Sequence, residues 1–322
     1  MRRLVSLVVI LVAACSGNPK PKPDAAKDIG FNKPSTSLHA NMDVSGTVVD
    51  LGPADLSCLG TASADVATTV PVVLTTTVKD FQDNAKLNGG AVNPVNITAF
   101  KDVDYTHPFD TQMSTYSSTA CPKNAPCGNV MVTVPVGTKR FGFQMVDPAA
   151  SPAFLPTFLL FQSVDPSTPA QTLDKIQTVG QSTAQLLPAL IGETRTPGTG
   201  VLAGALRDCS KHEISNFVAT VSSTPGTATP ISGSEAYYFQ SGVDLPVHHC
   251  MDGMCTQNEL DSASGDGLFM AIQLPPSTMA YVQMWGYKSD ADVGGPMTEI
   301  AELQVPVLAD SVVTGSYEPL RQ

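Results

Sequence analysis

The segment from His248 to Cys255 carries the densest group of side chains that could bind a metal ion. It contains two histidines, two cysteines and two methionines, and imidazole, thiolate and thioether groups are ligands for zinc and copper. Adjacent His248 and His249 would point to opposite faces of a strand, and free thiolates are vulnerable outside the cytoplasm. We therefore favour a disulfide-pinned loop with exposed histidines. Metal binding by His248 and His249 is the alternative.

The sequence offers little material for catalysis. His212-Glu213 begins like the H-E-x-x-H motif of zinc proteases, but Asn216 occupies the position of the second histidine. There is no G-x-S-x-G nucleophile elbow, P-loop or dinucleotide-binding fingerprint in the sequence, which has only five histidines. We therefore expect a protein without enzymatic activity.

Three aromatic residues, Tyr281, Trp285 and Tyr287, lie close together on or just after an expected strand. Alternation along a strand would place all three rings on one face. Such a face could form a platform for a sugar ligand. The filling of a sandwich core is the interpretation that we favour, because a sandwich packs its interior with residues of this kind.

The cysteines are the firmest indication of compartment. Apart from Cys15 the chain has six of them, and an even number in an exported protein predicts disulfides. Cys121 and Cys127 enclose a short loop with two prolines, which predicts a local disulfide worth less than the ~3 kcal/mol of a 15-residue loop. If Cys250 pairs with Cys255 by analogy, Cys58 and Cys209 are left. Cys58 and Cys209 could join the turn-rich lead-in segment (42–69) to the second of two expected domains (200–317). Alternatively, Cys209 could bond to the Cys250 loop.

The N-terminus has the parts of a secretory signal: two arginines, an apolar run over residues 4–12, and two alanines before Cys15. The run is shorter than the ~20 apolar residues of a transmembrane helix. Residues 11–15, Leu-Val-Ala-Ala-Cys, resemble the bacterial lipobox, in which the cysteine receives diacylglycerol before cleavage. The resemblance implies an acyl lipid on Cys15, and we expect no other cofactor. Ser16 stands where an aspartate would favour inner-membrane retention, so we expect the outer membrane, facing the periplasm or the cell surface.

The charge balance limits the partners of the mature chain. Loss of residues 1–14 removes two arginines and no acid, so the formal net charge changes from −11 to −13. This acidity argues against nucleic acid and against anionic lipid as electrostatic partners. We expect contact with the membrane through the lipid anchor alone, and with proteins or glycans of the envelope or the extracellular space.

An internal repeat organises the rest of the chain. Residues 74–81 align with residues 202–209, so that Val-Lys-Asp meets Leu-Arg-Asp, and residues 130–141 align with residues 270–281. The offset grows from 128 to 140 between these two blocks, so the second copy has about a dozen extra residues in its middle loops. Each copy also places two cysteines shortly before its late strand.

The two copies resemble carboxypeptidase regulatory-like, or transthyretin-like, domains. That family opens with G-x-V-x-D and later shows D-G-x-F and P-P-G. Residues 204–208 (Gly-Ala-Leu-Arg-Asp), 266–269 (Asp-Gly-Leu-Phe) and 275–277 (Pro-Pro-Ser) carry the likeness. The first copy departs from it, with Thr76 in place of the glycine. These motifs specify turns, and the resemblance implies seven-stranded Greek-key sandwiches without intrinsic enzymatic activity.

The sequence therefore predicts an all-β protein with two Greek-key β-sandwich domains of prealbumin or Ig-like type and a short helical connector. Its expected role is a surface adhesion, scaffold or envelope-assembly function, and the alternative is a module that binds carbohydrate or metal. The expected segments are a signal peptide (1–14), a lipidated flexible tether (15–41), a turn-rich lead-in (42–69), the first sandwich (70–163), the helical connector (164–199) and the second sandwich (200–317).

Overall fold

The computed structural model describes residues 34–44, 47–62, 65–81, 95–114, 128–190, 193–240, 245–247 and 267–319. The signal segment, Cys15, the Cys121–Cys127 loop and the residues from His248 to Cys255 lie outside these ranges, so the predictions on them stay predictions. Within the ranges described, no helix is both long and apolar enough to cross a membrane.

The regular secondary structure of the described residues is mostly β-strand, with one short α-helix, which confirms the all-β prediction. In the first half the strands are β1 (His39–Val44), β2 (Thr47–Pro53), β3 (Val72–Asp80), β4 (Asn96–Lys101), β5 (Pro108–Met113), β6 (Gly128–Val134), β7 (Phe141–Val146), β8 (Phe154–Leu155), β9 (Thr157–Gln162), β10 (Ala170–Thr172) and β11 (Ile176–Gly180). After helix α1 (Gln181–Leu190) come β12 (Gly200–Leu206), β13 (Glu213–Ser215), β14 (Val218–Ser222), β15 (Glu235–Gln240), β16 (Leu245–Val247), β17 (Leu268–Leu274), β18 (Ser277–Gly286), a 3-10 turn η1 (Asp290–Asp292), β19 (Thr298–Val307) and β20 (Val312–Tyr317).

The first sandwich packs β6 and β3 against β4 and β7. Strand β3 alternates buried and exposed residues over most of its length, and β6 does the same, as expected for a sheet with one face in a core. Val72, Leu74 and Val132 from this sheet pack against Ile97 and Phe143 from the opposite sheet. The short strands β10 and β11 pair in parallel with successive parts of the other edge of β3.

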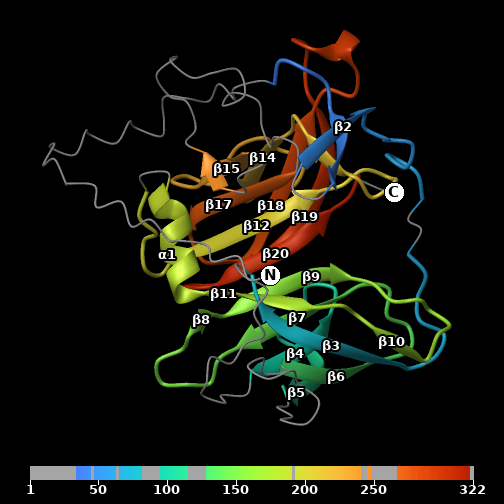
Figure 1. Cartoon of the computed structure of the whole chain (residues 1–322), viewed down its shortest axis with the longest axis vertical. Coiled ribbons are helices and arrows are strands. Elements are labelled where there is room, and N and C mark those ends of the chain that lie inside the picture. Colours follow the sequence, from blue (N-terminus) through green and yellow to red (C-terminus); the bar gives the residue numbers. More distant parts are fainter. Residues whose placement is uncertain are drawn as a thin grey trace, which may run out of the picture.

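The second sandwich packs β17, β12 and β20 against the sheet β14-β18-β19. Its core includes Leu202 and Phe269 on one side, and Val282, Met284 and Val305 on the other. A small sheet of β13, β1 and β2 lies at one end of this unit and carries the beginning of the described chain (Figure 1).

Strand pairing in the two sandwiches follows the sequence repeat. The antiparallel pair Val72 and Val134 of the first unit corresponds to Gly200 and Leu274 of the second, with the offsets of 128 and 140 found in the sequence. Beyond this point a register shift in β12 displaces the second pairing by one residue. In both units the repeated strand also has a parallel neighbour, β11 or β20, on its other edge.

The two sandwiches are joined through one sheet. Strand β20 pairs in parallel with β12 on one side and with β9 on the other, where Val312 lies opposite Thr157. The described strands of this joined sheet run in the order β16-β15-β17-β12-β20-β9-β7-β4-β5, and Figure 1 shows its middle strands side by side. Phe100 and Phe158 on the first-unit strands enter the core of the second sandwich. Strand β9 is therefore covered on both faces, and β4 is so only at Phe100.

The segment between the sandwiches differs in part from the predicted helical connector. Residues 170–172 and 176–180 form β10 and β11, and the helix is confined to α1. Its buried side chains are Thr183, Ala184 and Pro188, whereas Leu186 and Leu190 are exposed. Pro188 does not stop the helix, which continues for two residues. Helix α1 packs through Ala184 on a cluster that includes Val201 of the joined sheet.

Candidate functional site

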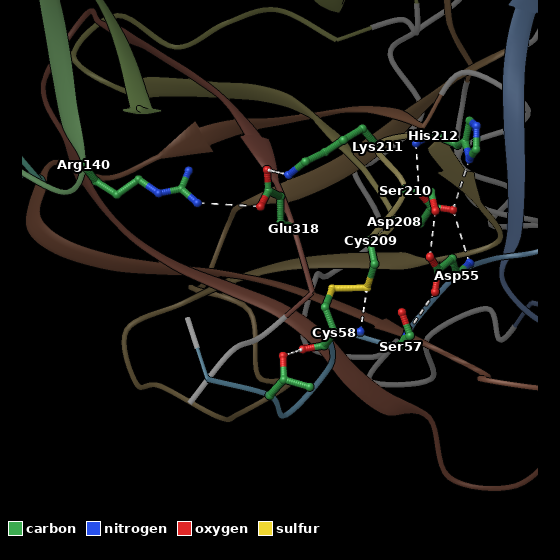
Figure 2. Close-up of a disulfide and its surroundings, with 11 residues drawn as sticks. Asp55, Ser57, Cys58, Arg140, Asp208, Cys209, Ser210, Lys211, His212 and Glu318 are labelled. Atoms are coloured by element: carbon green, nitrogen blue, oxygen red, sulfur yellow. Dashed lines mark hydrogen bonds and ion pairs between the residues drawn. A yellow bond between two sulfur atoms is a disulfide. The ribbon is translucent and has the colours of Figure 1, made fainter. Parts of the chain in front are cut away.

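A disulfide joins Cys58, in the turns after β2, to Cys209, in the turn between β12 and β13. The S–S distance is 1.99 Å and the Cα atoms are 5.7 Å apart. Cys58 is largely buried, and its backbone N–H donates to the Sγ of Cys209 at 2.9 Å (Figure 2). Of the two pairings that the sequence left open, the structure contains the one that joins the lead-in segment to the second domain.

Asp208, the aspartate of the G-x-V-x-D match, holds the turn that carries Cys209. Its side chain is 1% exposed, and one carboxylate oxygen accepts the N–H of His212 at 2.8 Å. The other oxygen accepts the N–H of Asp55 at 3.2 Å, which fixes the lead-in segment to the same turn. The aspartate therefore stabilises its own turn and also fixes the lead-in segment to it.

Asp55 provides the reciprocal contacts from the lead-in segment. Its carboxylate accepts the N–H of Ser57 at 3.0 Å and the hydroxyl of Ser210 at 2.7 Å (Figure 2). Hydrogen bonds from Ser57 and then Ser210 lower the pKa of Asp55 to about 2. This carboxylate therefore stays ionised at neutral pH. Because Ser210 donates to Asp55, the nearby Ser210, His212 and Asp208 are not arranged as a Ser–His–Asp relay.

Glu318 ties this region to the first sandwich. One of its oxygens accepts from the ammonium group of Lys211 at 2.5 Å, and the other lies 3.6 Å from the Nη2 of Arg140 (Figure 2). Arg140 also donates to Asp65 at 2.7 Å and to the carbonyl of Phe161 at 3.0 Å. The region around the disulfide is therefore a set of structural contacts between the lead-in, the second sandwich and the first.

The three aromatic residues singled out in the sequence do not share one surface. Tyr287 follows the end of β18 and is fully buried, with its hydroxyl 3.4 Å from the carbonyl of Gly295. Tyr281 and Trp285 are half-buried, and the Trp285 indole donates to Thr220 at 3.1 Å. The register shift opposite Met284 and Trp285 places its extra residue, Ile300, in β19, and β18 pairs with β14 without a break from Tyr281 to Trp285. Tyr281 and Trp285 therefore share one face of the sheet, whereas Tyr287 lies beyond the end of β18.

Strand β19 of the same sheet carries a pair of glutamates, Glu299 and Glu302, which no sequence motif indicated. Glu299 lies opposite Trp285, and Glu302 lies opposite Gln283. Glu302 accepts the side-chain amide of Gln283 at 2.8 Å and the N–H of Gly226 at 2.6 Å. Burial, and then the neighbouring charge of Glu302, raise the pKa of Glu299 to about 7. The two carboxyl groups come together through the strand register, which sequence spacing alone does not reveal.

A groove of about 520 Å³ opens beside the end of β14. It lies between the segment 222–232 and residues 275–277, which join β17 to β18. Its lining consists of serine and threonine side chains with a few apolar residues. Serine and threonine hydroxyls both donate and accept hydrogen bonds, so the groove offers uncharged hydrogen-bonding groups on a surface that is otherwise apolar.

Metal binding has no support among the residues that the structure covers. There, no three His, Cys, Asp or Glu side chains come together as a group that could hold an ion. His248 and His249 lie outside those residues, so metal binding by them stays an untested alternative.

No known protein family and no curated protein matches the sequence. Several solved structures are similar to parts of the chain. Three of them are the Bacillus anthracis TIE protein (8% identity, 78% of this chain and 34% of that one, TM-score 0.21), a variant of shaft pilin SpaA from Lactobacillus rhamnosus GG (10% identity, 78% and 99%, TM-score 0.22) and a streptococcal ancillary pilin (14% identity, 78% and 63%, TM-score 0.19). The chain thus spans about a third of the TIE protein. TM-scores at this level do not establish a shared fold or function.

Proposed function

We propose that this chain is a non-enzymatic lipoprotein of the bacterial cell envelope, held to the outer membrane by a lipid on Cys15. In this role its joined β-sandwiches serve adhesion, scaffolding or envelope assembly. The Cys58–Cys209 disulfide is the observation that carries the proposal. Disulfides of this structural kind persist in oxidising compartments and are rare in the cytosol, so the bond agrees with the secretory signal in the sequence.

The way in which the chain is held together fits a module that presents a surface at a distance from the membrane. Residues 16–33 contain the Lys-Pro-Lys-Pro stretch and few large apolar residues, a composition typical of a flexible tether. The tether ends earlier than the predicted residue 41, because Leu38 is buried and β1 pairs with β2 and β13. The segment after β2 is then fixed to the second sandwich by the disulfide and by Asp208. The carboxypeptidase regulatory-like assignment of the sandwiches is part of this proposal.

Fractionation of bacteria that produce the full chain tests the proposed address. We expect the chain in outer-membrane fractions, labelled by a palmitate analogue, and we expect a Cys15→Ala variant to lose the label. Recovery of the unprocessed chain from the cytosol, with Cys58 and Cys209 reduced, would contradict the proposal.

Chemical cross-linking in intact envelopes tests the proposed role. Affinity purification of the tagged chain should yield specific envelope or extracellular components, and the Cys15→Ala variant provides the control for correct placement. An adhesion or scaffold function predicts partners that are lost in this control. Cross-linking to the same components with and without the anchor would contradict a role that depends on anchoring.

A further inference from the structure

The groove beside β14 has the size of a ligand site. Its volume of about 520 Å³ falls in the ~300–1,000 Å³ range of small-molecule sites. It is formed by two parts of the second sandwich, the segment after β14 and the turn between β17 and β18. It lies apart from the disulfide region, whose side chains bond to one another.

The lining of the groove selects for the chemistry of its ligand. None of the ten lining residues is charged, and seven of them are serine or threonine. A charged ligand would lose hydration there without meeting an opposite charge. A wholly apolar ligand would leave hydroxyl groups without hydrogen-bond partners. A neutral ligand with many hydroxyls meets both conditions, and its C–H faces match the apolar surfaces of Pro230, Ile231 and Pro275.

The wall of the groove is held in place by its own hydrogen bonds. The Ser222 hydroxyl donates to the carbonyl of Thr224 at 2.7 Å, accepts the N–H of Thr224 at 3.0 Å, and lies 2.8 Å from the Thr227 hydroxyl. Two side chains of the sheet β14-β18-β19 also hold this wall. Gln283 donates to the carbonyl of Thr224 at 3.2 Å, and Glu302 accepts the N–H of Gly226. A wall fixed before binding loses little conformational freedom when a ligand enters.

Four lining residues with hydroxyl side chains are exposed on this wall. They are Ser223, Thr224, Thr229 and Ser232. They are therefore within reach of a ligand, whereas Ser222 is buried and serves the wall.

We propose that this groove is a binding site for a neutral saccharide. The inference deepens the proposed function by naming a ligand class for the envelope module. Binding by the purified chain does not depend on where the chain is anchored, so failure of one proposal is distinguishable from failure of the other.

Saturation-transfer NMR on the purified full chain tests the proposal, in a detergent without sugar groups such as lauryldimethylamine oxide. The probes are maltose, cellobiose and N,N′-diacetylchitobiose. We expect saturable binding of at least one of these with a Kd at or below about 1 mM, and no binding of a sulfated disaccharide. Lack of saturable binding by all three neutral probes would overturn the proposal.

Two variants locate the binding. The double substitution Thr229→Val with Ser232→Ala removes two exposed hydroxyls at nearly constant volume, and should weaken binding about tenfold. Ser223→Trp fills the groove and should abolish binding. Thr111→Val, on the exposed strand β5 of the first sandwich, is the matched control and should bind as the original chain does.

Thermal melting of each variant shows whether a loss of binding reflects a loss of folding. All of the substituted positions are exposed, so the melting temperatures should stay unchanged. Unaltered affinity in the Ser223→Trp variant would contradict the assignment of the groove. Mass spectrometry could also show that the groove hydroxyls carry covalently attached sugar. This result would contradict the proposal, because the groove would then be a glycosylation site and not a saccharide-binding site.

Discussion

The two sandwiches pair their repeated strands, β3 and β12, in the same way on one edge. The parallel neighbour on the other edge of these strands differs between the two units. In the second unit β20 lies beside β12 without a break from Val201 to Leu206. In the first unit the corresponding neighbour of β3 is split into β10 and β11. The equivalent positions Gly204 and Thr76 show the consequence. A Cβ on Gly204 would lie 2.5 Å from the Gly315 carbonyl oxygen, whereas the first unit holds a threonine. A shared topology thus allows different side chains where the neighbouring strand is interrupted.

The predicted local disulfide of the first unit contrasts with the long-range Cys58–Cys209 bond of the second, and removal of these cysteines should give the largest effects. Replacement of both Cys58 and Cys209 by alanine should lower the free energy of unfolding by about 4 kcal/mol, because the bond closes a long loop. Replacement of both Cys121 and Cys127 should cost less than ~3 kcal/mol. Urea unfolding of the two double variants measures the difference, and a larger loss for the second pair would contradict this comparison.

Gly204→Ala should be the next most damaging change. The added Cβ would lie 2.4 Å from the Tyr317 ring as well as close to the Gly315 carbonyl. The carbonyl cannot move without disturbing the β12–β20 pairing, so we expect a loss of about 3 kcal/mol, at the upper end of typical overpacking costs. Gly315→Ala, in the neighbouring strand β20, is the matched control, because its φ is not positive and its Cβ would meet only the Leu160 carbonyl oxygen at 3.9 Å. Equal losses for the two variants would show that close packing is not the cause.

The glutamate pair gives the second sandwich a pH dependence. With its pKa raised to about 7, Glu299 keeps a proton in the folded chain that the unfolded chain releases near its ordinary pKa. This contribution is full below about pH 4.5 and is lost as the pH rises through about 7. It should be smaller than about 1 kcal/mol because solvent screens the half-buried group. The melting temperature should therefore fall over this range, and Glu299→Gln should flatten the fall. An unchanged slope in Glu299→Gln would refute the assignment.

Thr76→Val should have the smallest effect, and in the direction opposite to Gly204→Ala. Thr76 is 2% exposed, and in the described part of the chain its hydroxyl has no hydrogen-bond partner. Valine keeps the branched shape and removes this buried hydroxyl, so stability should stay unchanged or rise by up to about 1 kcal/mol. Thermal melting measures the change. A clear loss of stability would show that the hydroxyl is engaged in the folded chain.

Much of the fold follows from local patterns in the sequence. Alternation predicts β3 and β6, and the aligned repeat anticipates that Val72 pairs with Val134 as Gly200 pairs with Leu274. The joined sheet could not be predicted in this way, because the parallel pairing of β20 with β9 links residues about 150 positions apart and leaves no local signature. Leu186 and Leu190 have helical spacing but are exposed, because α1 docks through the face that carries Thr183, Ala184, Leu187 and Pro188.

The candidate sites were less predictable than the strands. Tyr287 was expected on the same face as Trp285, but β18 ends at Gly286, so alternation no longer places Tyr287. Glu299 and Glu302 are three residues apart, which places them together only because Ile300 and Ala301 are both turned into the core. The hydroxyl groove depends on the approach of residues 275–277 to residues 222–232, and neither segment indicates it alone. The pairing of Cys58 with Cys209 likewise needed the tertiary structure.

The central claim is that this is an exported, lipid-anchored chain whose lead-in is pinned to the second sandwich by a disulfide. Mass spectrometry of non-reduced peptides from the chain isolated from its own membranes tests it most directly. The account predicts that the mature chain begins at Cys15 with a diacylglycerol modification, and that the peptides of Cys58 and Cys209 are linked to each other. A chain that begins at Met1 with an unmodified Cys15 and with free thiols at Cys58 and Cys209 would contradict it.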